Sequence, residues 1–241
     1  MGWIAKVLGP KSCTGKPKRM KGLPHELGST GFGVSKSTLI ALQHMKSDPK
    51  KTTFAVEGFG NVGWFAAKDL IESGLTLVAV SDSKGLLYVK EGIDFKKLAA
   101  VKKKTGSVVN YGKGTVFRKT DIVSLDVDVL ITAAIPDLIN TLNYNTVKAK
   151  LIIEGSNIPM TQEVETLLHK KGVLVIPDFV ANAGGVISSY VEYIGGTKEK
   201  MFDMVEKKVV RNTRLTLERA VKEKITPREA AMKIAIERIQ K

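Results

Sequence analysis

Short apolar runs alternate with segments of helical spacing along most of the chain. The runs are rich in β-branched residues or leucine, a composition typical of parallel strands that are covered on both faces. They lie at residues 53–57, 76–80, 127–132, 151–154 and 173–176. Apolar residues at helical spacing occupy residues 34–45, 61–72 and 161–171. This alternation of strands and helices predicts an α/β fold.

Two regions depart from the alternation. Residues 86–117 are less regular, with a helix expected at 95–104 and strand-like pieces at 108–111 and 116–117, and we interpret this region as a surface excursion. From Lys200 onward the spacing is helical, which predicts two C-terminal helices. The second helix should begin after Thr226 as N-cap, with Pro227 in the first helical position and Glu229 completing a capping box.

The composition is that of a globular protein. Of the 241 residues, 43% are hydrophobic and 26% are charged. No apolar run approaches the roughly 18 residues that span a bilayer, so we expect no membrane partner and a cytoplasmic location. The single cysteine, Cys13, cannot close an internal disulfide, which fits a reducing compartment. We expect Cys13 to be inert.

The formal net charge of +14 raises the question of nucleic-acid binding, because a basic surface attracts phosphate whatever its fold. The basic residues are spread along the chain and are densest at 16–21 and 102–104, without interleaved aromatic residues for base stacking. We therefore do not expect a nucleic-acid partner. A solvated lysine-rich surface, or a basic segment facing an acidic partner surface, accounts for the charge.

A glycine motif stands between the strand expected at 53–57 and the helix expected at 61–72. Gly58, Gly60 and Gly63 have the spacing G-x-G-x-x-G. In this motif the first glycine permits a tight turn, the second lets a pyrophosphate approach the backbone, and the third lets the helix pack closely on the strand. The phosphate then lies at the helix N-terminus, here at Asn61 and Val62, where unpaired N–H groups favour an anion. The motif predicts a dinucleotide site.

An acidic residue at the end of the next strand supports this interpretation. Asp82 stands where a carboxylate meets the adenosine ribose hydroxyls, which a glycine-rich turn without a ligand would not require. Because a carboxylate repels a 2′-phosphate, Asp82 favours NAD as the cofactor. Ser83 and Lys84 beside it could accommodate the phosphate, so NADP stays possible.

With this site in place, the elements predict a Rossmann-type fold, with a doubly wound, mostly parallel sheet, flanking helices and a C-terminal helical segment. We divide the chain into three parts. Residues 1–28 are a basic N-terminal lead-in, residues 29–199 are the NAD(P)-binding Rossmann domain, and residues 200–241 are helices that pack on this domain or extend from it.

Further stretches resemble the glutamate dehydrogenase family, within the wider Glu/Leu/Phe/Val dehydrogenases. They are "TGKP" at 14–17, "GSTGFGV" at 28–34, "VEGFGNVG" at 56–63, "VSDSKG" at 80–85, "EGSNIPMT" at 154–161 and "PDFVANAGGVISSYVEY" at 177–193. They occur in the family's order and cover nearly the whole chain. The resemblance implies an NAD(P)-dependent oxidoreductase of amino-acid metabolism, which oxidises L-glutamate to 2-oxoglutarate and ammonia.

The resemblance also implies cofactor contacts. Thr30 would hold the nicotinamide carboxamide, and the small residues Ala133 and Ala134 would let the cofactor lie against a strand end. Asn157 would contact the nicotinamide ribose side, and Asn182 would lie near the nicotinamide and the substrate amino group. Taken as residues alone, Thr30 could instead be a helix N-cap, and each asparagine a turn residue.

Val186 and Ser189 resemble the family's substrate-facing residues and, three positions apart, share one face of a helix. Ser189 would hydrogen-bond the side-chain carboxylate of glutamate. In the family, lysines and an aspartate of a separate N-terminal domain hold the substrate and transfer protons, and the "PAPD" context of that domain does not occur in this sequence. We therefore expect no catalytic residue, no metal ligand and no turnover by the chain alone.

Two hypotheses follow. The chain is the cofactor-binding part of a glutamate dehydrogenase, which meets L-glutamate or 2-oxoglutarate only with a complementary domain, or it is a stand-alone dinucleotide-binding or regulatory module without turnover. A complementary domain and a homo-oligomer are both possible partners. The sequence leaves open whether the chain is an expressed domain, a truncated gene product or one part of a split enzyme.

Overall fold

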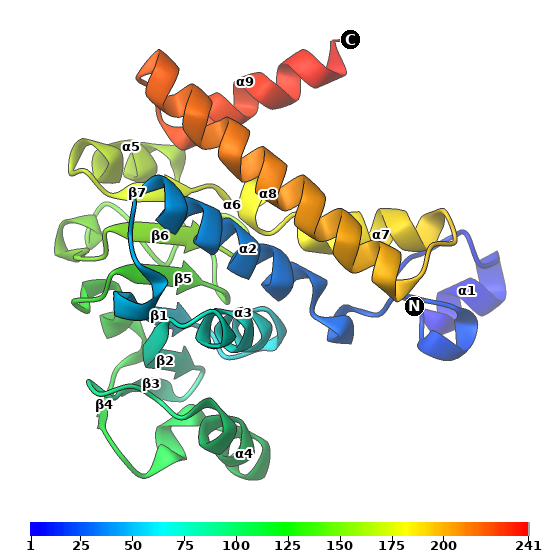
Figure 1. The fold of residues 1–241 in the computed structure, drawn as a ribbon. Coiled ribbons are helices and arrows are strands. Elements are labelled where there is room, and N and C mark those ends of the chain that lie inside the picture. Colours follow the sequence, from blue (N-terminus) through cyan, green and yellow to red (C-terminus); the bar gives the residue numbers. More distant parts are fainter. Residues whose placement is uncertain (241) are drawn as a thin grey trace.

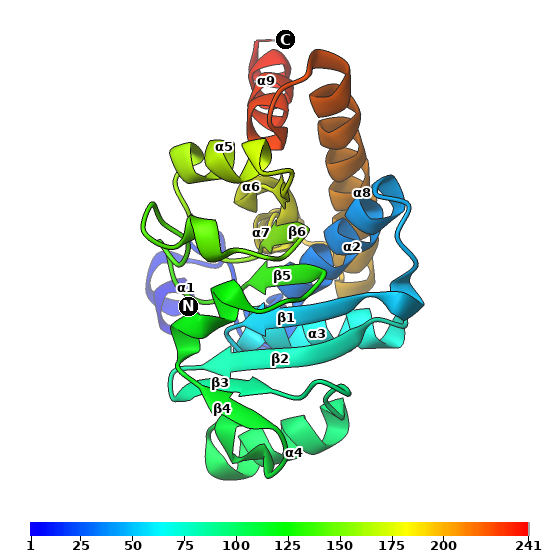
Figure 2. The same ribbon diagram turned by 90° about the vertical axis from the view of Figure 1, so that its left-hand side faces the viewer.

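A seven-stranded sheet forms the centre of the computed structural model, which describes residues 1–240 (Figures 1 and 2). The strand order is β4-β3-β2-β1-β5-β6-β7. The strands are β1 (Thr53–Glu57), β2 (Thr76–Asp82), β3 (Gly85–Tyr88), β4 (Thr115–Phe117), β5 (Val129–Thr132), β6 (Leu151–Glu154) and β7 (Leu174–Ile176). The β2–β3 and β3–β4 pairs are antiparallel and all other pairs are parallel. The predicted Rossmann-type fold class is confirmed.

Helices cover both faces of this sheet. They are α1 (Gly2–Leu8), α2 (Ser29–His44), α3 (Asn61–Glu72), α4 (Phe95–Thr105), α5 (Gln162–Lys170), α6 (Asp178–Ala181), α7 (Gly184–Tyr193), α8 (Lys198–Glu223) and α9 (Pro227–Ile239). α2 and α3 pack together on one face, and α5 packs on the other. Figure 1 shows α8 crossing over α2, from α7 at one end to α9 at the other.

Strand β1 shows why the strands are continuous apolar runs. Phe54 and Val56 enter a hydrophobic cluster with α2 and α3, whereas Ala55 between them enters a second cluster with α5. All three residues are fully buried. Because alternate side chains of a strand point to opposite faces, the sheet is buried on both sides, and no polar alternation marks it in the sequence.

Residues 86–117 extend the sheet, so their interpretation as a surface excursion is wrong. Leu86 and Leu87 lie in β3 and are buried. β3 folds back on β2 through a tight turn, in which the Lys84 N–H donates to Asp82 Oδ1 over 2.9 Å. The expected strand-like piece at 116–117 is part of β4, an exposed edge strand, and the expected helix at 95–104 is α4.

The expected strand at 108–111 is also wrong, because these residues form a short 3-10 helix. In this segment, side chains accept hydrogen bonds from backbone N–H groups that, in a strand, would donate to a neighbouring strand. The Val108 N–H donates to Asp82 Oδ2 at 2.8 Å, and the Val109 N–H donates to Ser107 Oγ. Local hydrogen bonds of this kind compete with strand pairing.

Helix α2 begins at Ser29, five residues before the expected start at residue 34. Its first turns contain Gly31 and Gly33. A methyl group on Gly31 would lie 2.5 Å from the Val62 carbonyl oxygen, so this glycine allows α2 to pack closely on α3. The two C-terminal helices are confirmed as α8 and α9, and α9 has the predicted capping box of Thr226 and Glu229.

A buried ion pair ties the segment before α2 to α7. Lys16 Nζ donates to Glu192, and these side chains are only 7% and 1% exposed. Glu192 also accepts from the N–H groups of Gly15 at 2.9 Å and Leu23 at 2.6 Å. Burial disfavours its charge, but the hydrogen bonds from Lys16 and the backbone outweigh burial and lower the pKa of Glu192. Residues 15–23 therefore have a defined position on α7.

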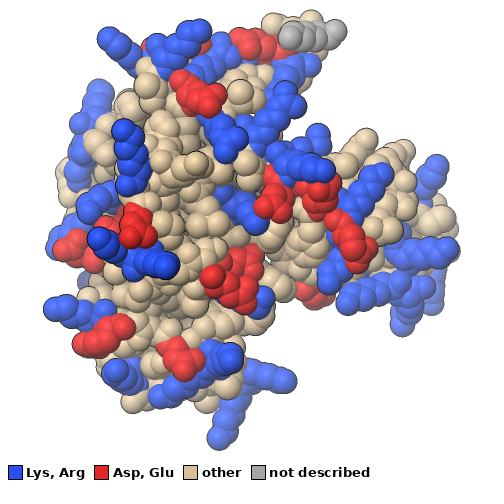
Figure 3. All heavy atoms as spheres, in the orientation of Figure 1, with Lys and Arg blue, Asp and Glu red and all other residues tan. Residues whose placement is uncertain are grey.

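The surface of the described residues is charged, and no membrane-spanning helix is found among them. Within residues 1–240, no helix is both long and apolar enough to cross a membrane. On the face shown in Figure 3, Lys and Arg side chains are spread over the whole outline, with acidic side chains among them.

Candidate functional site

The carboxyl ends of β1, β2 and β5 border a cleft of about 360 Å³. Strand ends of an open parallel sheet are where such folds bind their ligands. The lining residues are Glu57, Gly58, Phe59, Gly60, Ser81, Asp82, Ser83, Lys102, Lys119, Thr120, Ala134, Ile135 and Leu138. The cleft thus brings together Gly58, Gly60, Asp82, Ser83 and Ala134, all of which we singled out in the sequence.

The three glycines of the motif are needed for different reasons. Gly58 has a φ of +91°, and a methyl group on it would lie 2.5 Å from Ala134 Cβ. A methyl group on Gly63 would lie 2.0 Å from the Gly58 carbonyl oxygen. Gly60 differs, because no atom lies within 4 Å of the position that its methyl group would take. The protein itself requires Gly58 and Gly63, while the space above Gly60 is open to a ligand.

Glu57 is a site residue that the sequence analysis missed. It is the last residue of β1, and its Oε2 accepts hydrogen bonds from the N–H groups of Ala133 and Ala134, each at 3.0 Å. Burial raises the pKa of Glu57, although these hydrogen bonds oppose the shift. Glu57 therefore fixes the loop after β5 directly beside Gly58. The sequence feature that could have indicated this residue is an acidic side chain at the end of an otherwise apolar strand.

The Asp82 carboxylate, which we expected to accept hydrogen bonds from the ribose, already accepts four hydrogen bonds from the protein. Oδ1 accepts from the Lys84 N–H at 2.9 Å and the Ser107 hydroxyl at 3.1 Å. Oδ2 accepts from Lys102 Nζ at 2.6 Å and the Val108 N–H at 2.8 Å. Burial opposes the charge, but these bonds outweigh it and lower the pKa of Asp82. The carboxylate is ionised, 5% exposed, and hydrogen-bonded at both oxygens.

Two lysines that line the cleft were not predicted. Lys102, on α4, pairs with Asp82 and keeps 27% of its side chain exposed. Lys119 follows β4 in the chain, and its charge acts on Glu57, where it lowers the pKa against the larger effect of burial. A pattern of helical spacing does not reveal that α4 directs a lysine to the end of β2.

A second hollow, of about 380 Å³, is lined by the predicted residues Asn157, Asn182 and Val186. Asn182 Nδ2 donates to Asn157 Oδ1 at 2.8 Å, so the structure brings these two predicted residues together. Lys208 and Asn212 of α8 also line this hollow and were not predicted.

The remaining predicted residues line neither hollow. Thr30 Oγ1 would lie 2.9 Å from a methyl group on Gly185, so Thr30 stands against the start of α7. The Asn61 side chain donates to the His25 carbonyl oxygen at 2.7 Å, and Val62 packs against the core. Ser189 is half-buried on α7. Ala133 is not a lining residue of the cleft, but its N–H donates to Glu57 and its backbone lies beside Gly58.

Comparisons with known proteins identify the family of the chain. The model of the glutamate/leucine/phenylalanine/valine dehydrogenase family matches residues 22–241. The chain is 44% identical over 236 residues to a glutamate dehydrogenase of Aeropyrum pernix and 40% identical over 236 residues to one of Thermotoga maritima. Each match covers 94% of this chain and 56% of the relative. The chain thus spans about half the length of these relatives.

A solved structure is similar over the same extent. The hetero-hexameric glutamate dehydrogenase of Thermus thermophilus, in its leucine-bound form, superposes with a TM-score of 0.86 at 26% sequence identity. The superposition covers 97% of this chain and 57% of that one. A second, from Peptoniphilus asaccharolyticus, gives a TM-score of 0.80 at 28% identity, covering 98% of this chain and 58% of the other.

Proposed function

The chain belongs to the glutamate/leucine/phenylalanine/valine dehydrogenase family of amino-acid oxidoreductases, and we propose that it is the cofactor-binding part of a glutamate dehydrogenase. In this proposal it binds a nicotinamide dinucleotide across the ends of β1, β2 and β5. It supplies the hydride acceptor for oxidation of L-glutamate to 2-oxoglutarate. Its single free cysteine supports a cytoplasmic setting.

The observation that carries the proposal is the open space above Gly60. Of the three motif glycines, only this one has no protein atom near its absent side chain, and it stands at the N-terminus of α3. A pyrophosphate needs that combination of backbone access and unpaired N–H groups. We assign the adenosine side to Asp82 and Ser83, and the nicotinamide side to Thr30, Ala133, Ala134, Asn157 and Asn182.

A fluorescence titration with NADH tests the binding half of the proposal. We expect a saturable signal with a Kd in the micromolar range or weaker, which corresponds to a binding free energy of about −8 kcal/mol or one less negative than that. Failure of both NADH and NADPH to give a saturable signal would overturn the dinucleotide assignment.

The substrate half needs a separate test. We propose that Val186 and Ser189 face L-glutamate, and that the base and the cation for the α-carboxylate come from a complementary domain, because the "PAPD" context that carries these groups in the family does not occur in this sequence. A positioned acid or base alone contributes about 10²–10⁴ in rate, so we expect the purified 241-residue polypeptide to show no glutamate-dependent reduction of NAD⁺ or NADP⁺.

Adding a separately expressed lysine-bearing domain from a relative discriminates the two hypotheses. Restored activity supports the dehydrogenase part. Binding without restorable activity favours a stand-alone dinucleotide module, and turnover by the polypeptide alone contradicts our assignment of the chemistry. The hetero-hexameric relative from Thermus thermophilus supports assembly with further subunits as part of this proposal.

The choice between NAD and NADP depends on Asp82 and Lys102. Asp82 alone favours NAD, but its charge is paired with Lys102, and Lys119 is a second cation that lines the cleft. Pairing removes most of the repulsion that a 2′-phosphate would meet. We therefore propose that NADPH binds at least as tightly as NADH.

Replacing Lys102 with methionine tests this proposal. The change removes a cation and exposes the Asp82 charge, so NADPH should bind about tenfold or more weakly, while NADH changes little. Lys103→Met, an exposed neighbour on α4, is the matched control. If the unmodified chain prefers NADH by about tenfold, which is about 1.4 kcal/mol, the role of Lys102 is refuted and Asp82 sets the choice.

A further inference from the structure

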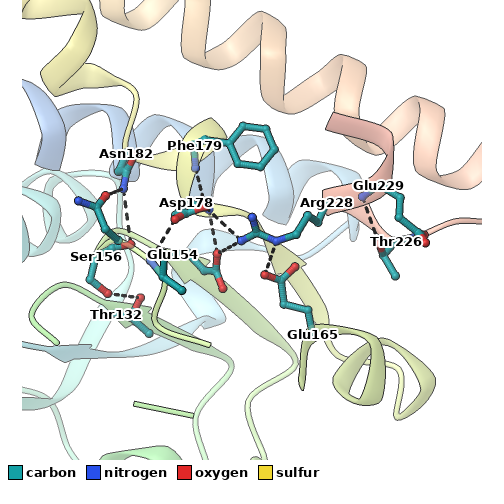
Figure 4. A network of polar contacts seen from close by, with 12 residues as sticks. Thr132, Glu154, Ser156, Glu165, Asp178, Phe179, Asn182, Thr226, Arg228 and Glu229 are labelled. Atoms are coloured by element: carbon teal, nitrogen blue, oxygen red, sulfur yellow. Dashed lines mark hydrogen bonds and ion pairs between the residues drawn. The ribbon is translucent and has the colours of Figure 1, made fainter. Parts of the chain in front are cut away.

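A single arginine from α9 joins three acidic side chains, two that follow or end β6 and β7 and one on α5 (Figure 4). Arg228 Nη2 donates to Glu154 at 2.9 Å and to Asp178 at 3.1 Å, and Arg228 Nε donates to Glu165 at 2.5 Å. The guanidinium carbon lies 5.4 Å from the centre of the Phe179 ring. All of these partners precede Arg228 by about fifty residues or more in the chain, so this side chain ties α9 to distant elements, in addition to the packing of Ala230 and Ala231 in the interior.

The carboxylates are also connected to the loops that carry the two asparagines. Asp178 Oδ2 accepts from the Ile158 N–H at 3.0 Å, and the Asp178 N–H donates to Glu154 Oε2 at 2.8 Å. Ile158 follows Asn157, and Asn182 follows α6, which begins at Asp178. The Asn182–Asn157 hydrogen bond closes the path. A displacement of Asp178 would therefore move both asparagines.

Burial makes Arg228 important for this arrangement. The Glu154 side chain is fully buried, and its Oε1 has no hydrogen-bond partner among the described residues. Burial, together with the nearby Glu165 charge, raises the pKa of Glu154 to about 9. Glu165 and Asp178 are also largely buried, so the guanidinium is the cation that compensates them. Its planar fork serves several carboxylate oxygens at once, which a lysine ammonium cannot do in the same geometry.

We propose that Arg228 is a positioning residue, through which α9 fixes Asn157 and Asn182 for the nicotinamide half of the dinucleotide. The identity of the ligand in this inference rests on the proposed function, whereas the chain of hydrogen bonds from Arg228 to the asparagines does not. The inference predicts different behaviour for the two halves of the cofactor. The adenosine and diphosphate half is bound at Gly60 and Asp82, which lie at the ends of other strands, so its binding does not depend on Arg228.

Two variants test the proposal, Arg228→Met and the milder Arg228→Lys, which keeps the charge in case the first does not fold. Titrations with NADH and with ADP separate the two halves of the cofactor. In Arg228→Lys we expect NADH to bind about fivefold or more weakly, the scale of one lost hydrogen bond, with ADP changed by less than about twofold. Equal weakening of NADH and ADP would indicate general destabilisation and overturn the proposal.

Hydrogen exchange gives a readout that needs no ligand. The Ile158 and Asp178 N–H groups donate into the network, so they should exchange faster in both variants, while the β1 and β2 amides keep their protection. The matched control is Arg219→Met, which removes an arginine that joins α8 to α9 through Glu237 without reaching the loops. Unchanged exchange at Ile158 and Asp178 in Arg228→Lys, or equal acceleration in Arg219→Met, would refute the positioning role. If the unmodified chain binds neither ligand, the proposed function fails while the exchange experiment still decides this inference.

Discussion

Replacing Gly60 with valine is expected to abolish measurable dinucleotide binding while leaving the thermal unfolding midpoint of the chain unchanged. The new side chain meets no protein atom within 4 Å at its Cβ, so the fold has room for it. It fills the space through which a pyrophosphate reaches the N-terminus of α3. We expect affinity for NADH to fall by about a hundredfold or more, which is about 2.7 kcal/mol. Fluorescence titration and a circular dichroism melt measure the two effects.

Gly63→Ala is the matched control with the opposite expectation. A methyl group there would lie 2.0 Å from the Gly58 carbonyl oxygen, so α3 must move away from β1 and the midpoint should fall. Unimpaired NADH binding in Gly60→Val would show that the ligand does not pass over this glycine, and our placement of the pyrophosphate would be wrong.

The second large effect is expected for Lys16→Met. This change leaves the Glu192 carboxylate, 1% exposed, without its cation. Breaking a buried ion pair by removing one partner costs about 3–5 kcal/mol, although the Gly15 and Leu23 N–H groups that still donate to Glu192 place the expected loss near the lower end. Urea unfolding measures the loss, and limited proteolysis shows whether residues before α2 are released first.

Lys18→Met removes an exposed lysine from the same segment and should change the free energy of unfolding by less than about 0.5 kcal/mol. If Lys16→Met unfolds at the same urea concentration as Lys18→Met, Glu192 is held by its backbone donors alone. The buried pair would then contribute nothing to the attachment of this segment.

Local pattern was sufficient for the parallel strands and for the glycine motif. A strand buried on both faces is a short apolar run whatever its neighbours are, and G-x-G-x-x-G describes one continuous turn. The error at β3 has the opposite cause. Leu86 and Leu87 are two residues in an irregular region, and only the turn held by Asp82 brings them onto β2.

The sequence predicted those site residues whose positions follow from a single turn or strand. Asp82 was correctly placed at the end of β2, but its partners Lys102 and Ser107 lie 20 and 25 residues further along and reach it only in the folded chain. Glu57 was overlooked because a buried acid in a strand looks like an interruption of the apolar pattern. Its partners, 76 and 77 residues away, explain it. Long-range hydrogen bonds leave no period in the sequence.

The position of Arg228 in the chain also sets an order for folding during synthesis. Glu165 and Asp178 leave the ribosome before the arginine that compensates them, which follows by 63 and 50 residues. Until then these side chains cannot be buried as ions without a large penalty. The nascent chain can assemble β1, β2 and β5 before then. We expect the final packing of Glu165 and Asp178 beside β6 and β7 to follow translation of α9.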